Sequence, residues 1–293
     1  MKSHKNCPVC NKNEFLPFLN VKDHFLSKED FILQVCPDCK LVLTNPYPDK
    51  VEIGKYYESE KYFSHPDKVK TFFSETYELV KKINIKYKFK VATSGFVKGS
   101  LLDIGCGSGD FLSLAKMQGW DICGVEPNEN ARSYSKEKTL SNILSPEELV
   151  LQADHSFDVI TMWHVLEHVE DLNWQCMQLH RLLKPGGRLI IALPNINSYD
   201  ALYYKEYWAA YDVPRHLYHF SFSTIRQLLS KHGFNFLKRE PLKWDAYYIA
   251  LLSEKHRAGS SNYPLALLNA WKSNFNAIKT REYSSNIYIF YAS

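Results

Sequence analysis

The stretch Leu101-Leu102-Asp103-Ile104-Gly105-Cys106-Gly107-Ser108-Gly109-Asp110-Phe111-Leu112 decides the fold class of this chain. A short apolar run ends in a glycine turn, which predicts a buried strand, a tight loop and then a helix. Loop glycines permit positive φ angles and let a ligand approach the backbone closely. The spacing G-x-G-x-G differs from the G-x-G-x-x-G pattern that holds a pyrophosphate at a helix N-terminus. Asp103 at the strand end would repel a phosphate and suits a ligand with an ammonium group.

A second acid, Glu126, closes the next apolar run at residues 122–125. An acid at the end of the second strand can accept hydrogen bonds from both hydroxyls of a ribose. Glu126 alone would fit NAD as well. The two acids together with the glycine spacing favour S-adenosylmethionine, which carries an amino-acid end and a sulfonium but no phosphate.

Strands and helices alternate from Ser100 onward. The sequence predicts strands at 101–104, 122–125, 157–162, 188–193, 234–239 and 287–291, with helices that include 110–118 and 173–183. This order implies a mostly parallel sheet with helices on both faces, the doubly wound α/β class. We expect three regions: a zinc ribbon at 1–48, a helical connector at 49–98, and the α/β domain at 99–293. Two lid insertions are expected near 198–222 and 242–285, the second of them helical.

Residues 100–195 resemble the class I S-adenosylmethionine-dependent methyltransferases, especially the branch that includes ubiquinone-type O-methyltransferases. The matching segments, in order, are LDIGCGSG (102–109), GVEP (124–127), FDVI (157–160), LEHV (166–169) and LLKPGGRLII (182–191). The resemblance implies a seven-stranded, Rossmann-like sheet whose last strand is antiparallel, and S-adenosylmethionine as the cofactor.

The same resemblance implies which residues meet the cofactor. The expected contacts are Asp103, Gly105, Gly107 and Glu126, with the adjoining Cys106, Gly109 and Pro127. The adenine is expected near residues 145–148, after a strand at 142–144. The methionine end is expected along Met162-Trp163-His164, which adds Trp163 and His164. Tyr56, Tyr57 and Tyr62 in the connector are further candidates to cover the cofactor.

Methyl transfer is an in-line displacement, in which the enzyme mainly aligns the nucleophile, carbon and sulfur. A base helps when the acceptor is a hydroxyl or an amine, and histidine suits this role near neutral pH. His164 and His168 are four residues apart, so we expect them on one face of a helix after the fourth strand. The alternative for His168 is a helix cap or a core hydrogen bond. As a metal site this pair would need a third ligand, and none is obvious.

A run rich in functional groups, YWAAYDVPRHLYHF, occupies residues 207–220. We interpret it as a lid over the acceptor, with Arg215, His216 and His219 as the best candidates for catalysis or acceptor contact. Similar Pro-Arg-His-Leu-x-His-Phe runs occur in the same methyltransferase branch. The alternative is a loop braced by an Arg–Asp pair with packed aromatic rings. Asn195, just after the 188–193 strand, is a further candidate because strand ends on this side of an open sheet face the ligand crevice.

Two Cys-x-x-Cys pairs, Cys7 with Cys10 and Cys36 with Cys39, lie 25 residues apart. Each pair can offer two thiolates to one ion, which predicts a closed, structural Cys₄ zinc site. A redox role for the pairs is the minor alternative. Cys106, Cys123 and Cys176 fall within the α/β pattern and are expected to be buried.

The composition limits the possible partners. A net charge of +4 over 293 residues is a weak bias, far from that of a nucleic-acid-binding tail. The branch resemblance implies a small-molecule or glycan acceptor, with an oxygen on a sugar or quinone-like molecule as the acceptor atom. The N-terminus lacks the apolar region of a signal peptide, and no run of eighteen apolar residues predicts a membrane span. A cytoplasmic protein is therefore expected, and the sequence leaves its oligomeric state open.

Two other functions fit parts of the sequence. An RNA methyltransferase could use the ribbon to hold nucleic acid, but basic residues do not cluster there, and Met162-Trp163-His164 replaces the Asn-Pro-Pro-Tyr type of motif. A non-catalytic module could carry a ribbon on a degenerate methyltransferase scaffold. The intact glycine loop and both acids argue against that loss.

Overall fold

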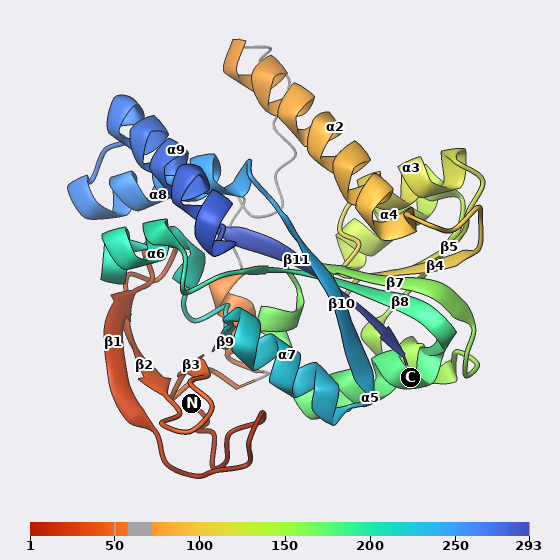
Figure 1. Cartoon of the computed structure of the whole chain (residues 1–293), viewed down its shortest axis with the longest axis horizontal. Coiled ribbons are helices and arrows are strands. Elements are labelled where there is room, and N and C mark those ends of the chain that lie inside the picture. Colours follow the sequence, from red (N-terminus) through yellow and green to blue (C-terminus); the bar gives the residue numbers. More distant parts are fainter. Residues whose placement is uncertain (50, 58–71, 293) are drawn as a thin grey trace.

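The structure, a computed structural model, describes residues 1–49, 51–57 and 72–292. Tyr62 and the middle of the expected connector lie outside the described residues. Its central feature is a sheet of seven strands in the order β10-β11-β8-β7-β4-β5-β6 (Figure 1). These strands are β4 (Ser100–Ile104), β5 (Asp121–Val125), β6 (Asn142–Leu144), β7 (Phe157–Trp163), β8 (Leu183–Pro194), β10 (Phe234–Pro241) and β11 (Ser285–Ala292).

The pairing of these strands confirms the predicted fold class. β4 to β8 pair in parallel, whereas β11 runs antiparallel to both β8 and β10. Parallel strands are buried on both faces and therefore read as continuous apolar runs. β8 begins at Leu183, five residues before the start predicted from its apolar segment.

Alternate residues of each strand enter two separate cores, because successive side chains point to opposite faces. Leu101 belongs to a core that contains residues of α2 (Phe72–Thr93) and α3 (Asp110–Met117). Leu102 belongs to the other core, which contains residues of α5 (Leu172–Leu182) and α7 (Phe222–Lys231). Figure 1 shows these two helix layers above and below the sheet. The remaining helix of this region, α4 (Glu129–Thr139), packs beside α3.

The two insertions are mostly helical and lie at the carboxyl ends of the strands. The first holds α6 (Tyr199–Tyr204), two short 3₁₀ turns, η4 (Lys205–Tyr207) and η5 (Ala209–Tyr211), and the strand β9 (Tyr218–His219). The second consists of α8 (Asp245–Ala258) and α9 (Tyr263–Thr280), which pack against each other and against α6 (Figure 1). Within the described residues, each helix is too short or too polar to cross a bilayer.

The N-terminal region shares a sheet with the first insertion. β1 (Leu16–Lys22), β2 (Asp30–Val35) and β3 (Val42–Thr44) form an antiparallel meander, and β9 adds to its edge beside β3. Cys7, Cys36 and Leu41 belong to the same core as Leu102 of the large sheet. The ribbon is therefore built onto the α/β domain by shared strands and a shared core.

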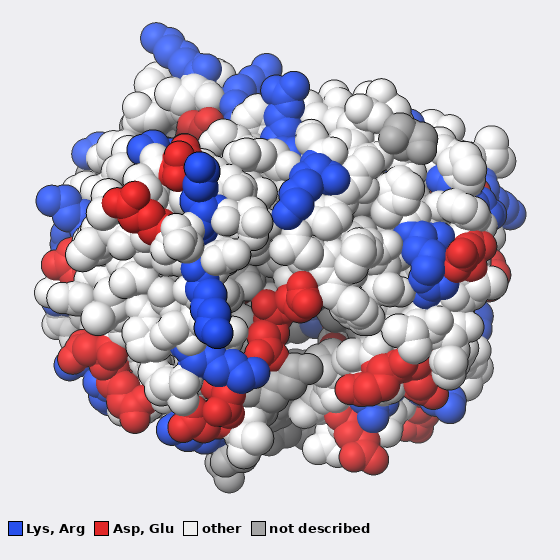
Figure 2. Space-filling view, turned by 90° about the horizontal axis from the view of Figure 1, so that it is seen from below, with Lys and Arg blue, Asp and Glu red and all other residues white. Residues whose placement is uncertain are grey.

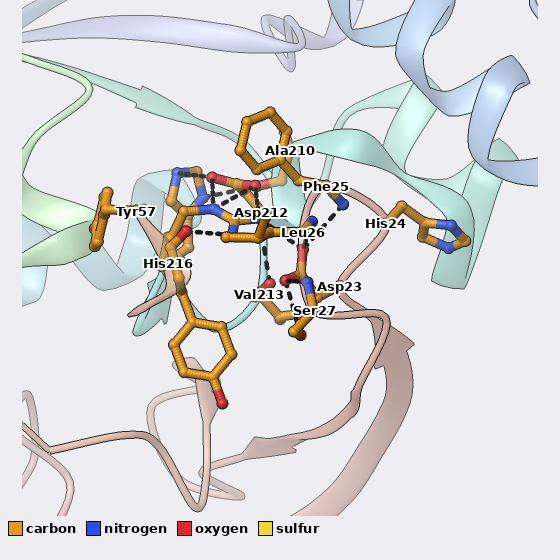
Figure 3. Close-up of polar contacts among 12 residues, drawn as sticks. Asp23, His24, Phe25, Leu26, Ser27, Tyr57, Ala210, Asp212, Val213 and His216 are labelled. Carbon is orange, nitrogen blue, oxygen red and sulfur yellow. Dashed lines mark hydrogen bonds and ion pairs between the residues drawn. The ribbon is translucent and has the colours of Figure 1, made fainter. Parts of the chain in front are cut away.

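A buried ion pair joins the two parts at this junction. Arg215 of the first insertion lies 2.9 Å from Asp23, which follows β1, and both side chains are almost completely buried. Asp212 contacts the same guanidinium at 2.6 Å. Figure 3 shows Asp23 and Asp212 reaching this point from the ribbon and from the insertion. Asp23 also accepts hydrogen bonds from the backbone of Phe25, Leu26 and Ser27, so it holds its own turn in shape.

Replacing Asp23 by alanine should destabilise the protein. Loss of one partner leaves a charge buried, so we expect the free energy of unfolding to fall by about 3–5 kcal/mol, measured by chemical denaturation. Asp154→Ala is the control, since Asp154 pairs with Arg181 while 63% exposed and should cost less than about 1 kcal/mol. Equal losses for the two variants would contradict the importance of the buried pair.

The effect of Asp23→Ala should also depend on pH. Burial alone would raise the pKa of Asp23, but Arg215 and the backbone hydrogen bonds lower it to about 2. A lowered pKa stabilises the fold above the ordinary value near 3.8, and this stabilisation is lost as the pH falls towards 2. The difference between wild type and Asp23→Ala should be constant above about pH 5 and shrink below pH 4.

Candidate active site

A large cavity opens at the carboxyl ends of the parallel strands. Its volume is about 1550 Å³, and its walls come from the glycine loop, the end of β5, the 3₁₀ turn η2 (Pro146–Leu151), the turn η3 (Leu166–His168) and the ribbon's exit at Tyr47, Pro48 and Asp49. Ligands of open α/β sheets bind at this edge because the loops there diverge. The cavity exceeds the roughly 300–1,000 Å³ of a typical single-ligand pocket.

The glycine loop forms the floor of the cavity. Gly105 has φ +72°, and a Cβ there would approach Val165 to 2.4 Å, so close packing requires glycine at this position. Gly107 also has a positive φ, at +54°, but a Cβ there would meet nothing within 4 Å. Gly107 therefore presents open backbone to the cavity. Gly109 caps the N-terminus of α3.

Glu126 lies beside this loop and lines the cavity. Its two carboxylate oxygens accept hydrogen bonds from the backbone N–H of Gly107, at 2.8 Å, and of Asn128, at 2.9 Å. These bonds orient the carboxylate at the end of β5, with Pro127 as the adjoining wall. The arrangement suits a ligand that carries adjacent hydroxyls.

Asp103 is buried at the end of β4, beneath the loop. β4 and β7 place it opposite Thr161, whose hydroxyl donates a 2.6 Å hydrogen bond to its carboxylate. Burial raises the pKa of Asp103 to about 7, against the opposing effects of Thr161 and the Lys88 ammonium. A cationic ligand near this carboxylate would favour its ionised form.

Two other expected cofactor residues point into the protein. The Cys106 thiol faces Ser135 of α4, at 3.8 Å. The Trp163 ring packs edge-on against Phe111 of α3, with ring centroids 5.3 Å apart, while the Lys88 ammonium lies 4.9 Å from the centre of the Trp163 ring. Lys88 was missed from the sequence, because nothing distinguishes it from the other lysines of α2 until the helix packs over the site.

His164 and His168 do not share a helix, which corrects the sequence prediction. His164 has a left-handed backbone with φ +58°, which interrupts any helix at that point. Only the three-residue turn η3 follows, and α5 begins at Leu172 with Asp171 as its N-cap. Strand β7 therefore does not run directly into a helix, and both histidines line the cavity.

The two histidines have opposite protonation tendencies. Burial would lower the pKa of His164, but Asp245 at 3.0 Å and Glu167 at 3.5 Å raise it to about 9. Burial lowers the pKa of His168 to about 4, and the nearby His216 adds to this effect. At neutral pH His164 is therefore a cation held by Asp245 of α8, and His168 is a neutral imidazole.

Comparison with known proteins identifies the family. Residues 80–239, more than half of the chain, match the family model described as "Methyltransferase domain". The chain belongs to this methyltransferase family. It is a class I S-adenosylmethionine-dependent methyltransferase.

Similar proteins agree with this membership. Curated relatives named ubiquinone biosynthesis O-methyltransferase occur in Rickettsia conorii, with 29% identity over 40% of this chain and 42% of the relative, and in Coxiella burnetii, with 28% identity over 56% and 70%. The match thus spans less than half of the Rickettsia relative.

Solved structures share the fold of the methyltransferase. Phosphoethanolamine N-methyltransferase 2 of Haemonchus contortus, solved with S-adenosyl-L-methionine, superposes with a TM-score of 0.54 at 18% identity, over 95% of this chain and 68% of that one. A methyltransferase of Archaeoglobus fulgidus has a TM-score of 0.50 at 23% identity, over 73% of this chain and 93% of that one.

Other polar residues predicted for the methyltransferase's acceptor are engaged within the protein. Asn195 is fully buried, and its amide donates hydrogen bonds to Glu282 and to the carbonyl of Tyr283, just before β11. His219 is buried in β9 beside the Thr44 hydroxyl, at 3.2 Å. Arg215 lines the cavity, but its guanidinium is neutralised by Asp23 and Asp212.

Tyr57 completes the cavity wall, and His216 lies behind it. The His216 ring lies 4.5 Å from that of His168, centroid to centroid, and its Nδ1 lies 2.9 Å from the carbonyl oxygen of Ala210. Tyr57, one of the connector tyrosines, lines the cavity with its hydroxyl 3.1 Å from Nδ1 of His168. The neighbouring Tyr56 is buried, and its hydroxyl donates a hydrogen bond to the Glu29 carboxylate.

The methyltransferase also carries the four predicted cysteines in one cluster. Cys7 and Cys39 have their sulfurs 3.4 Å apart, and Cys10 and Cys36 have theirs 3.5 Å apart. All four sulfurs lie within 4.8 Å of one another. A tetrahedral zinc ion with Zn–S bonds of about 2.3 Å needs sulfurs roughly 3.8 Å apart, so the cluster has the size that such an ion requires.

Replacing Glu126 by alanine should weaken binding of S-adenosylhomocysteine about 100-fold or more, because hydrogen bonds to a charged group contribute about 1.5–3 kcal/mol each. Isothermal titration calorimetry would measure the change. Glu129→Ala, an exposed acid in the first turn of α4, is the matched control and should bind as wild type does. Unchanged affinity in Glu126→Ala would remove Glu126 from the cofactor site.

Proposed function

We propose that this methyltransferase moves the methyl group of S-adenosylmethionine to a hydroxyl of a small molecule or a sugar. The observation that carries the proposal is the cavity, which is larger than a typical single-ligand pocket and joins Glu126 and the glycine loop above Asp103 to a wall with a neutral histidine. The relatives named ubiquinone biosynthesis O-methyltransferase support an oxygen acceptor.

The cofactor end of the proposal rests on the loop and its acids. Glu126 would hold the ribose hydroxyls, the open backbone at Gly107 would admit the nucleoside, and Asp103 would favour the cationic amino-acid end. Pro146, Glu147, Leu149 and Val150 of η2 line the cavity where adenine is expected. Gly105, Gly109 and Cys106 would shape the loop from beneath, His164 would border the methionine end, and Trp163 would pack behind it.

The acceptor end rests on the wall formed by His168, Arg215 and Leu217. The bound cofactor supplies a methyl group on a positively charged sulfur. The acceptor oxygen would attack the methyl carbon as the carbon–sulfur bond breaks, which leaves S-adenosylhomocysteine and a methyl ether. His168 is the preferred base for the released proton, because it is neutral and reaches the cavity, and His216 stands directly behind it. Arg215, His219 and Asn195 would brace the lid.

The surface favours a small acceptor over RNA. On the face shown in Figure 2, lysines and arginines are interspersed with aspartates and glutamates. Nucleic-acid-binding faces are instead dominated by basic side chains. An acceptor that enters the cavity between the ribbon's exit and the lid agrees better with this surface.

Calorimetry with S-adenosylhomocysteine, with NAD as the control, tests the cofactor, and an assay of methyl transfer to catechol-like and sugar hydroxyls tests the acceptor. We expect micromolar binding of S-adenosylhomocysteine, no binding of NAD, and turnover that falls in His168→Ala. Binding without turnover on any hydroxyl acceptor would support a non-catalytic module instead. Methylation of RNA alone would overturn the small-molecule acceptor.

We also propose that Cys7, Cys10, Cys36 and Cys39 hold one structural zinc ion. Four thiolates leave no open coordination position, so the ion would stabilise the ribbon rather than take part in chemistry. Cys36→Ser should lower the bound zinc by one equivalent, measured by elemental analysis, and should lower the melting temperature. Cys176→Ala, a buried thiol outside the cluster, should keep its zinc. Full zinc content in Cys36→Ser would contradict the site.

A further inference from the structure

A second group of potential metal ligands lies beside the cavity, away from the cysteines. It consists of Glu167 and His168 of η3 and His216 of the first insertion. One ligand atom from each residue lies within 4.8 Å of the others. Residues 168 and 216 are far apart in the sequence, and the fold brings them together because the backbone N–H of Leu217 donates to the carbonyl of Glu167, at 2.8 Å.

The Glu167 carboxylate is the least expected member of this group. The residue is 1% exposed, and neither carboxylate oxygen has a hydrogen-bond partner among the described residues. Its nearest ion-pair contact is Nδ1 of His164, at 3.5 Å. An ionised, buried carboxylate without hydrogen bonds is costly unless a cation compensates it.

Both histidines are oriented as metal ligands usually are. Nδ1 of His168 lies 3.0 Å from the carbonyl oxygen of Arg215, and Nδ1 of His216 lies 2.9 Å from that of Ala210. A carbonyl oxygen only accepts hydrogen bonds, so each Nδ1 carries the proton and each Nε2 has a free lone pair. Metal-bound histidines typically fix their ring in this way, with the distal nitrogen bonded to a carbonyl or carboxylate.

We propose that Glu167, His168 and His216 bind one divalent transition-metal ion, separate from the ion of the cysteine cluster. Two imidazoles and one carboxylate form the ligand set of mononuclear sites that keep coordination positions open. His168 lies in the cavity wall, with Glu167 and His216 behind it, so the ion would lie at the inner edge of the cavity. The proposal that this site binds an ion does not depend on the proposed function. The role of the ion rests on that function: with the ion bound, His168 is a ligand and no longer the base, and the ion would hold the acceptor oxygen and ease loss of its proton.

The neighbouring charged groups suit a divalent ion. Asp212 Oδ2 lies 4.0 Å from Nε2 of His216, the atom that would bind the ion, and adds negative charge there. His164 lies 3.0 Å from Asp245 as well as 3.5 Å from Glu167, so it is shared between the two carboxylates. The sequence offered His164 and His168 as a pair without a third ligand. In the structure the lid supplies His216 as that ligand, and Glu167 replaces His164 in the set.

The test uses the full chain with its cysteine cluster loaded with zinc, titrated with Co²⁺ and followed by calorimetry and visible absorption. Wild type should bind one equivalent of Co²⁺ with no loss of zinc and without the charge-transfer bands of a cobalt thiolate. Glu167→Gln and His216→Gln should each bind Co²⁺ about 100-fold or more weakly, since loss even of a supporting residue costs about 10–100-fold.

His232→Gln is the matched control, because His232 bonds to Asn173 outside the cluster and should leave Co²⁺ binding unchanged. Binding of S-adenosylhomocysteine and the melting temperature show whether each variant is folded. No Co²⁺ bound by wild type, or wild-type affinity for Co²⁺ in both folded variants, overturns the site. Methyl transfer at an unchanged rate without bound Co²⁺ would overturn the ion's role in the reaction and leave the proposed function. Co²⁺ binding with no methyl transfer would leave the site and overturn that function.

Discussion

The buried charge of Arg215 is the constraint on which the arrangement of this methyltransferase depends. A guanidinium removed from water needs both opposite charge and hydrogen-bond acceptors. Asp23 of the ribbon, Asp212 of the lid and the carbonyl of Tyr56 supply them. Because these partners come from three segments, the charge is satisfied only when ribbon, connector and lid are all in place.

The lid, residues 198–222, links the buried ion pair to the active site. Beside Arg215, the backbone carbonyl of His216 accepts a 2.7 Å hydrogen bond from the Thr44 hydroxyl of β3, and the next residue bonds to the backbone of Glu167. The imidazole of His216 is thereby held between the ribbon and η3. A ribbon that seems remote from the glycine loop thus determines where the lid histidine stands relative to His168.

The large sheet contributes the cofactor side of the site, through the carboxyl ends of its parallel strands. Parallel strands end together, so Asp103 and Glu126 reach the same edge, but their environments differ. Asp103 is sealed beneath the loop and has a raised pKa, whereas Glu126 borders the cavity and is oriented by two backbone N–H groups. The two acids therefore suit different parts of one ligand, a cation and a pair of hydroxyls.

The sequence by itself determined the doubly wound α/β fold class, the glycine loop with its two acids, and the two cysteine pairs. These features are local: apolar runs, glycine positions and ligand spacings act within a few residues. Tertiary structure alone decided the turn at His164, the pairing of His164 with Asp245, the burial of Arg215 and Asn195, and the meeting of Glu167 with His216. Helical spacing assumes an unbroken backbone hydrogen-bond ladder, and the left-handed residue His164 breaks it. The other contacts join segments tens of residues apart, and only packing of the lid and ribbon against the sheet brings them within reach.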